Sequence, residues 1–180
     1  MSLACLPVLL VVAWFRVRSG VHWRKALLET VFGLYMLVVA SMVFLPVYLG
    51  PVARAAHAES AARFGTDWFS PVPFHTIGAL LSHSTSTQLG LAAENLVLLL
   101  PFGLLAPAAF RRLRDGRVFL VAAISVAVLV EVGQLAERVA GLAFRSVDID
   151  DVILNTLGAL VGFAIFSVLA SIVDRVSLKR

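Results

Sequence analysis

The chemically most informative residues are charged and amide side chains that lie inside long apolar stretches of the sequence. Glu131 and Gln134 fall within the apolar run from 118 to about 136. With Arg138 they are spaced by three and four residues, so on a helix the three share one face. A carboxylate in lipid is costly and usually faces a bundle interior or an aqueous cavity. We therefore expect Glu131 either to pair with Arg138 or Arg145, or to serve a ligand or a proton.

A second polar stripe leads into the last apolar run. Asp148, Asp151 and Asn155 follow one another at spacings of three and four residues, and Gly158 and Gly162 continue the same stripe. Glycines four residues apart let a neighbouring helix come close. The aspartates could bind a ligand, or one of them could simply cap the N-terminus of the last helix. Both readings stay open at this point.

A third polar pair, Glu94 and Asn95, lies near the start of the apolar run 89–110. If the runs are transmembrane helices that alternate in direction, this pair and the two polar stripes come to the same end of the bundle. The amides of Gln134 and Asn155 could bind a ligand or join helices, which is worth about 0.6 kcal/mol each. The sequence predicts one shared polar pocket.

The composition requires lipid as the solvent for these elements. Hydrophobic residues make up 60% of the 180 residues and charged residues only 14%, against about 45–50% and about 25% in soluble domains. Mean hydropathy is +0.94. The runs lack the alternation of barrel strands, so backbone groups in lipid must be satisfied within helices. We predict an all-α, polytopic transmembrane helical bundle of about five spans: 2–15, 26–49, 89–110, 118 to about 136, and 152–173.

The first of these apolar runs is much shorter than the other four. Its 14 residues reach only about 21 Å at 1.5 Å per residue, which is short for a bilayer. A secretory signal has basic residues before its apolar core, whereas here Arg16 and Arg18 follow it. We expect a short span.

Basic residues near span ends mark the cytoplasmic side of a membrane protein. In a five-span chain all three basic clusters fall on one side, which predicts an outer N-terminus and an inner C-terminus. The formal net charge of +4 then reflects topology and contact with anionic lipid, and no nucleic-acid partner is expected. The clusters are Arg16, Arg18, Arg24 and Lys25; Arg111, Arg112, Arg114 and Arg117; and Arg175, Lys179 and Arg180.

The long loop between the second and third runs lies on the predicted outer side. Its segment 71–77 contains two prolines, which restrict the preceding residues to extended conformations, and we expect it to cover the site as a rigid lip. His57, His75 and His83 share this loop, but their spacing fits no metal motif. We expect no metal and no cofactor.

Several of these segments resemble the VanZ-like family of membrane proteins. The tract from Arg145 to Gly158, RSVDIDDVILNTLG, resembles the family signature. Glu131-Val-Gly-Gln134 resembles its Glu-x-x-Gln motif, and 95–103 resembles its helix with Asn and Pro-x-Gly. Val72-Pro73-Phe74 resembles its short Pro-Phe element, although Ser70 stands where an Asn is often found. The resemblance covers about residues 70 to 165.

The resemblance implies a multi-pass protein of the bacterial cytoplasmic membrane, in a family named for a member associated with teicoplanin resistance. It divides the chain into an N-terminal hairpin with the start of the outer loop (1–69), a VanZ-like core (70–165) and the end of the last span with a basic tail (166–180). The partners it implies are the bilayer and a lipid-linked cell-wall precursor or glycopeptide. The ligand-binding motif positions are Asn95, Glu131, Gln134, Arg145, Asp148, Asp151 and Asn155.

Three functions remain open. The first is a non-enzymatic protein that binds a lipid-linked envelope ligand or lipoglycopeptide at the outer leaflet, with Arg145 on phosphate. The second is an enzyme acting on a polyprenyl-phosphate-type lipid, in which Glu131, Asp148 and Asp151 hold Mg²⁺. The third is a small proton-coupled transporter that uses Glu131. The sequence favours the binding protein and leaves enzymatic activity undecided.

Overall fold

The computed structural model describes residues 11, 14–45, 50–64, 69–83, 85–140, 142 and 147–177 of the 180. Most of the predicted first span, 2–15, lies outside these residues. The described elements are α2 (Trp23–Phe44), α3 (Pro51–Phe64), β1 (Phe69–Ser70), α4 (His75–His83), α5 (Ser86–Leu98), α6 (Leu100–Ala109), the 3-10 helix η2 (Arg111–Arg114), α7 (Gly116–Val139), β2 (Val147–Asp148) and α8 (Ile149–Ser177).

Four helical segments are long and apolar enough to cross a membrane: Trp23–Phe44, Gln88–Ala109, Gly116–Val139 and Ile149–Ser177. Each contains most of one predicted apolar run, so the prediction of an all-α membrane protein is confirmed. Large apolar side chains such as Met42, Val121 and Val173 are more than half exposed on these helices. In a membrane these surfaces contact lipid.

Local sequence explains where the spans begin and bend. The Asp115 side chain accepts hydrogen bonds from the backbone N–H groups of Arg117 and Val118, at 2.9 and 3.1 Å, and so caps α7. The third span is divided at Leu99 into α5 and α6, with Pro101 in the first turn of α6. Proline has no N–H to donate, so Pro101 is tolerated in the first turn of α6, just after the break.

Helix α8 packs backbone to backbone against α5 and α6. A Cβ atom added at Gly158 would meet the carbonyl of Leu96, and one added at Gly162 would meet the carbonyl of Leu100. Gly103 of α6 has the same close contact with the Ala159 carbonyl. The predicted small-residue stripe therefore allows close packing, and its partner is the divided helix α5–α6.

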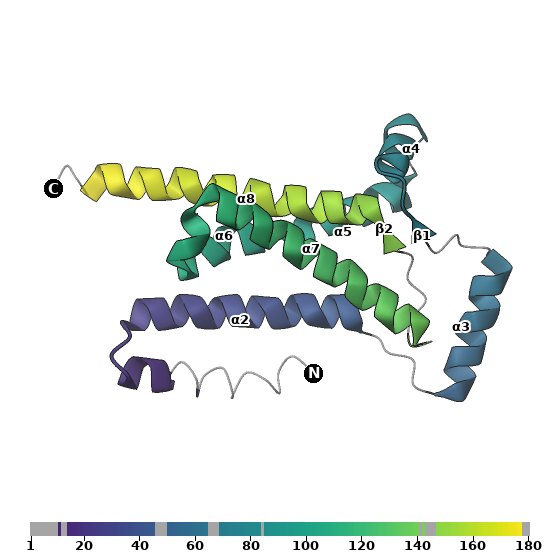
Figure 1. The fold of residues 1–180 in the computed structure, drawn as a ribbon, viewed down its shortest axis with the longest axis horizontal. Helices are drawn as coiled ribbons and strands as arrows, with labels where there is room; N and C mark the ends of the chain where they lie inside the picture. The colour runs from purple at the N-terminus through teal and green to yellow at the C-terminus, as the bar shows by residue number, and fades with distance from the viewer. Residues whose placement is uncertain are drawn as a thin grey trace.

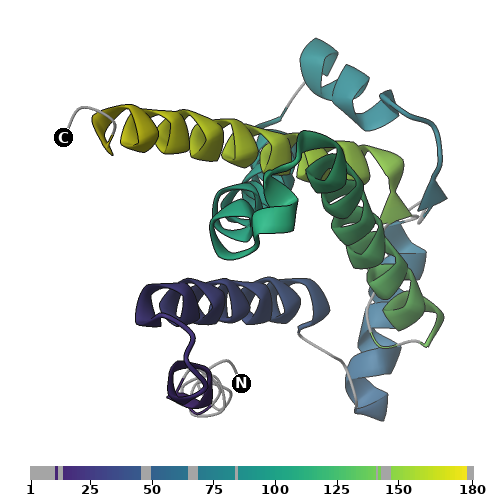
Figure 2. The same ribbon diagram turned by 60° about the vertical axis from the view of Figure 1, so that its left-hand side comes forward.

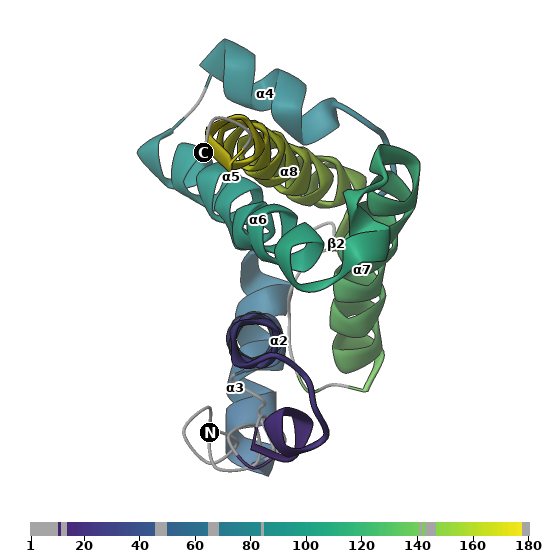
Figure 3. The ribbon, with the colours of Figure 1, turned by 90° about the vertical axis from the view of Figure 1, so that its left-hand side faces the viewer.

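Figure 1 shows how the bundle is oriented along its long axis. The start of α2, η2 and the C-terminal end of α8 lie toward one end, and these carry the described parts of the basic clusters. The opposite end holds α3, α4 and the two short strands. Figures 2 and 3 place α4 and α2 on opposite sides of α5–α6. The charge pattern predicts that the end with α4 is the outer one.

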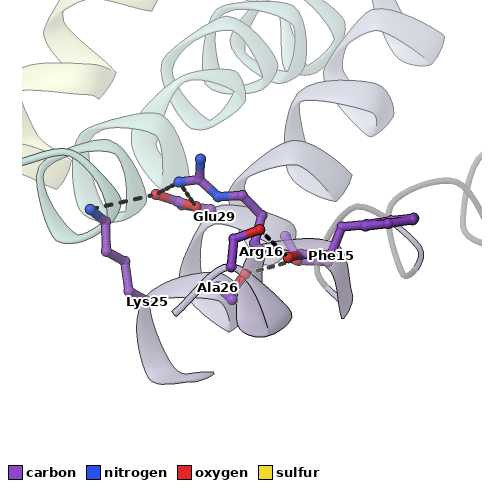
Figure 4. A network of polar contacts seen from close by, with 7 residues as sticks. Phe15, Arg16, Lys25, Ala26 and Glu29 are labelled. Carbon is purple, nitrogen blue, oxygen red and sulfur yellow. Dashed lines mark hydrogen bonds and ion pairs between the residues drawn. The ribbon is translucent and has the colours of Figure 1, made fainter. Parts of the chain in front are cut away.

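The N-terminal helical residues are tied to α2 by an ion pair near the basic end. The Arg16 guanidinium donates hydrogen bonds to both oxygens of the Glu29 carboxylate, at 2.9 and 2.7 Å (Figure 4). The Lys25 ammonium lies 4.0 Å from the same carboxylate. The negative charge of Glu29, which interrupts the second apolar run in the sequence, is thus neutralised near the start of that run.

One small element has no counterpart in the sequence predictions. Strands β1 and β2 pair in parallel, with Phe69 opposite Val147 and Ser70 opposite Asp148. This two-residue ladder joins the outer loop to the start of α8. Because it involves only two residues on each side, it leaves the fold class unchanged.

Candidate functional site

A polar cleft lies at the end of the bundle opposite the basic clusters. Its volume is about 660 Å³, and its walls come from α4, α5, α7 and α8. Four of the seven predicted site residues line it: Asn95, Gln134, Asp148 and Asp151. His75, Thr76, Gln88 and Glu94 add further polar groups. Polar residues from distant parts of the sequence are thus gathered in one place.

Asp151 and Asn95 form the direct link between α8 and α5 in this cleft. The Asn95 amide nitrogen donates a hydrogen bond to Oδ1 of Asp151. In the described part of the chain the other oxygen, Oδ2, has no hydrogen-bond partner, and both residues line the cleft. Asp151 therefore keeps one acceptor available to a ligand while the other fixes its orientation.

Asp148 caps α8, which is one of the two interpretations that the sequence left open, the other being ligand binding. Its Oδ1 accepts from the backbone N–H of Asp150 at 2.9 Å, and its Oδ2 accepts from the hydroxyl of Thr76 at 2.6 Å. Asp148 precedes the first residue of α8, so it satisfies an N–H that the helix leaves without an internal partner. It is a structural residue that also forms part of the cleft wall.

The sequence reasoning missed the role of Asp150. This side chain is fully buried, and its two oxygens accept hydrogen bonds from the backbone N–H groups of Phe74, at 2.6 Å, and Ile77, at 3.0 Å. These donors belong to the first turn of α4 and the residue before it, so Asp150 caps α4 from another helix. Phe74 has a φ of 64°, a region that non-glycine residues seldom occupy.

These contacts define what the predicted lip does. Residues 71–74 are an irregular, exposed segment, and α4 begins at His75. His75, Thr76 and Ala79 of α4 line the cleft. Part of the predicted lip is therefore a short helix, which Asp148 and Asp150 hold against α8.

Gln134 points into the cleft from α7 and is only 8% exposed. Within the described residues its amide has no hydrogen-bond partner. A side-chain amide can donate two hydrogen bonds and accept others through its oxygen. The unmet hydrogen bonds of Gln134 therefore face the space in which a ligand would lie.

Two other predicted site residues, Glu131 and Asn155, do not line the cleft. Glu131 is 5% exposed and lies one turn below Gln134 on α7. Asn155 is 1% exposed and follows Asp151 by one turn of α8, and neither of its amide atoms has a hydrogen-bond partner among the described residues. Arg145 lies outside the described residues. Some of the residues expected in one pocket therefore line the cleft, whereas Glu131 and Asn155 are buried one helical turn away from it.

The three carboxylates of the Mg²⁺ hypothesis do not form a metal-binding group. Among the described residues, no set of three or more His, Cys, Asp and Glu side chains is close enough to hold a metal ion. Asp148 and Asp151 line the cleft, whereas Glu131 does not.

Comparison with known sequences identifies the family. The sequence model of the VanZ/LLP1 family matches residues 32–170. The chain belongs to the VanZ/LLP1 family. No curated protein and no solved structure shows significant similarity to it. The match covers residues 32–44 of α2, the next two candidate spans in full and α8 up to residue 170, so it reaches further toward the N-terminus than the motifs in 70–165 indicated. In this VanZ/LLP1 protein the whole cleft lies inside the matched region.

Proposed function

We propose that this VanZ/LLP1 protein binds the polar part of an amphipathic cell-envelope ligand at the outer leaflet of the bacterial cytoplasmic membrane. The ligand is a lipid-linked cell-wall precursor or a lipoglycopeptide, and its binding is linked to glycopeptide resistance. The observation that carries the proposal is the polar cleft itself, which is lined both by Gln134 and by Asp151, and in which the Gln134 amide and one Asp151 oxygen have no hydrogen-bond partner among the described residues.

Each side chain has a role in this proposal. Asp151 and Gln134 bind head-group donors and acceptors, and Asn95 holds Asp151 in place through their hydrogen bond. Asp148 and Asp150 position α4 as one wall. Arg145 is assigned to phosphate, because a guanidinium suits bidentate phosphate contacts. Catalysis is the weaker candidate, because Glu131 lies apart from the carboxylates in the cleft.

The test is equilibrium binding of teicoplanin, and separately of a lipid-linked precursor, to the purified protein in nanodiscs. We expect saturable binding of at least one of them, weakened about tenfold in Asp151→Asn and Gln134→Ala by the loss of a ligand hydrogen bond. Asp174→Asn is the matched control, because Asp174 is an exposed α8 carboxylate at the far end of the helix. Absence of binding to both ligands, or equal affinity in all variants, contradicts the proposal.

The same variants can be compared in a teicoplanin-sensitive bacterium at matched protein levels. We expect the wild type and Asp174→Asn to protect, and Asp151→Asn to lose protection. Protection by Asp151→Asn equal to that of the wild type would remove the link between the cleft and resistance.

A further inference from the structure

A second hollow, an apolar groove, lies between α2 and α5–α6. Its volume is about 510 Å³. Val38 and Met42 of α2 form one wall, Val97 of α5 forms the other, and Pro101 of α6 closes one end. The lining runs from Gly90 to Pro101, about 16 Å along the helix axis at 1.5 Å per residue. The groove is therefore long enough, and apolar enough, for part of a hydrocarbon chain.

Glu94 joins this groove to the polar cleft, since it lines both. Within the described lining of the groove it is the only charged residue. The one other ionisable side chain there is Tyr35, whose hydroxyl already donates a hydrogen bond of 2.6 Å to the Leu98 carbonyl. Figures 2 and 3 show α5 between α4 on one side and α2 on the other, and residues of α5 line both hollows.

The charge of the cleft indicates which head group suits it. Glu94, Asp148 and Asp151 line it, and its described lining contains no lysine or arginine. Carboxylates grouped in a cleft raise the local concentration of cations. Both Asp148 oxygens already accept hydrogen bonds within the protein, so Glu94 and Asp151 are the carboxylates that a ligand can reach.

We propose that the ligand of this protein is an amphiphile with one hydrocarbon chain and a protonated amine, the chain lying in the α2/α5 groove and the amine meeting Glu94. The proposal rests on the proposed function and narrows its ligand to an amphiphile that carries an amine, whereas the phosphate contact assigned to Arg145 belongs to the alternative ligand, the lipid-linked precursor. The unpartnered Gln134 amide, buried on the far wall of the cleft, hydrogen-bonds the rest of the head group.

The experiment uses two photoreactive probes in phosphatidylcholine nanodiscs with the full chain. One is hexadecylamine and the other hexadecyl phosphate, each with a diazirine at the same chain position. After irradiation, labelled peptides are quantified by mass spectrometry. We expect the amine probe to label the groove residues Val38, Met42 or Val97, and to do so at least tenfold more than the phosphate probe.

Two surface variants test the two halves of the site without disturbing the core. Glu94→Gln should reduce amine labelling about tenfold and leave phosphate labelling unchanged, because a charge-assisted hydrogen bond becomes a neutral one. Val97→Trp should fill the groove and reduce labelling by either probe. Val121→Trp is the control, since Val121 of α7 is also more than half exposed but does not line the groove.

Equal labelling by both probes would mean that the groove holds ordinary bilayer lipid, and the inference would be wrong. Labelling outside the groove would overturn it as well. Teicoplanin or precursor binding in the same preparation separates the two proposals. If that binding depends on Asp151 and Gln134 while groove labelling fails, the proposed function stands and this inference alone is refuted.

Discussion

The two ends of the bundle are built from the same helices but use their polar residues differently. Toward the basic end, α8 packs by Gly162 against the α6 region, and Phe119 and Phe163 stack with ring centroids 4.4 Å apart. Toward the other end, the same helix presents Asp148, Asp151 and their hydrogen-bond partners to a cleft. Apolar contacts fill the first end, whereas polar side chains cap α8, anchor α4 and line the cleft at the second.

The comparison separates carboxylates that look alike in the sequence. Asp148, Asp150 and Asp151 are near neighbours in the chain, yet Asp150 is fully buried and anchors α4 while Asp151 lines the cleft. Charge at an apolar helix end therefore does not itself indicate a ligand site. The hydrogen bonds that each carboxylate oxygen already accepts show which aspartates are engaged within the fold and which one has an oxygen available to a ligand.

The largest effect should come from the close helix contact that lies between the two ends. Gly158→Ala places a Cβ against the Leu96 carbonyl, and we expect a loss of about 3 kcal/mol from overpacking. Thermal unfolding in detergent measures it. Gly90→Ala is the matched control, because open space surrounds Gly90, and there alanine should stabilise the helix by about 0.5–1 kcal/mol. Destabilisation of equal size in both variants would contradict the packing account.

A smaller loss should follow from Asp150→Ala. The change leaves the N–H groups of Phe74 and Ile77 without their acceptors, and we expect about 2 kcal/mol of local destabilisation. Hydrogen exchange should accelerate at these two amides and through α4, while exchange in the middle of α7 stays slow. Unchanged exchange in α4 would show that Asp150 does not anchor it.

Asn95 and Asp151 should be energetically coupled across the cleft. Asn95→Ala, Asp151→Ala and the double variant form a cycle, and we expect a coupling of about 1.5 kcal/mol for a charge-assisted hydrogen bond. Chemical unfolding of the four proteins in detergent measures it. Strict additivity would mean that the two side chains act independently.

The smallest effect should be at the Arg16–Glu29 ion pair near the basic end. The Arg16 side chain is 46% exposed, so solvent screens the interaction, and Arg16→Gln should cost less than about 1 kcal/mol. The loss should shrink further at high salt. A loss above about 2 kcal/mol that does not depend on salt would show that this contact contributes more to the fold than its exposure indicates.

Much of the fold could be predicted from local sequence, because long apolar runs in lipid can only be helices. The meeting of Asn95, Gln134, Asp148 and Asp151 could also be predicted, since their helices alternate in direction. The role of Asp150 could not, because it depends on backbone donors in α4 more than seventy residues earlier. The burial of Glu131 and Asn155 beneath the cleft could not be predicted either. It depends on how each helix is rotated about its own axis, which the spacing of polar residues does not determine.

The central claim, an accessible polar cleft at the outer end, can be tested by labelling a single cysteine. In a Cys5→Ser background, Ala92→Cys lies in the cleft and Ala123→Cys in the buried core. In sealed right-side-out membrane vesicles, a membrane-impermeant maleimide should modify Ala92→Cys within minutes, bound ligand should protect it, and Ala123→Cys should react only after denaturation. Modification of Ala92→Cys only in inverted vesicles, or only after denaturation, would contradict the account.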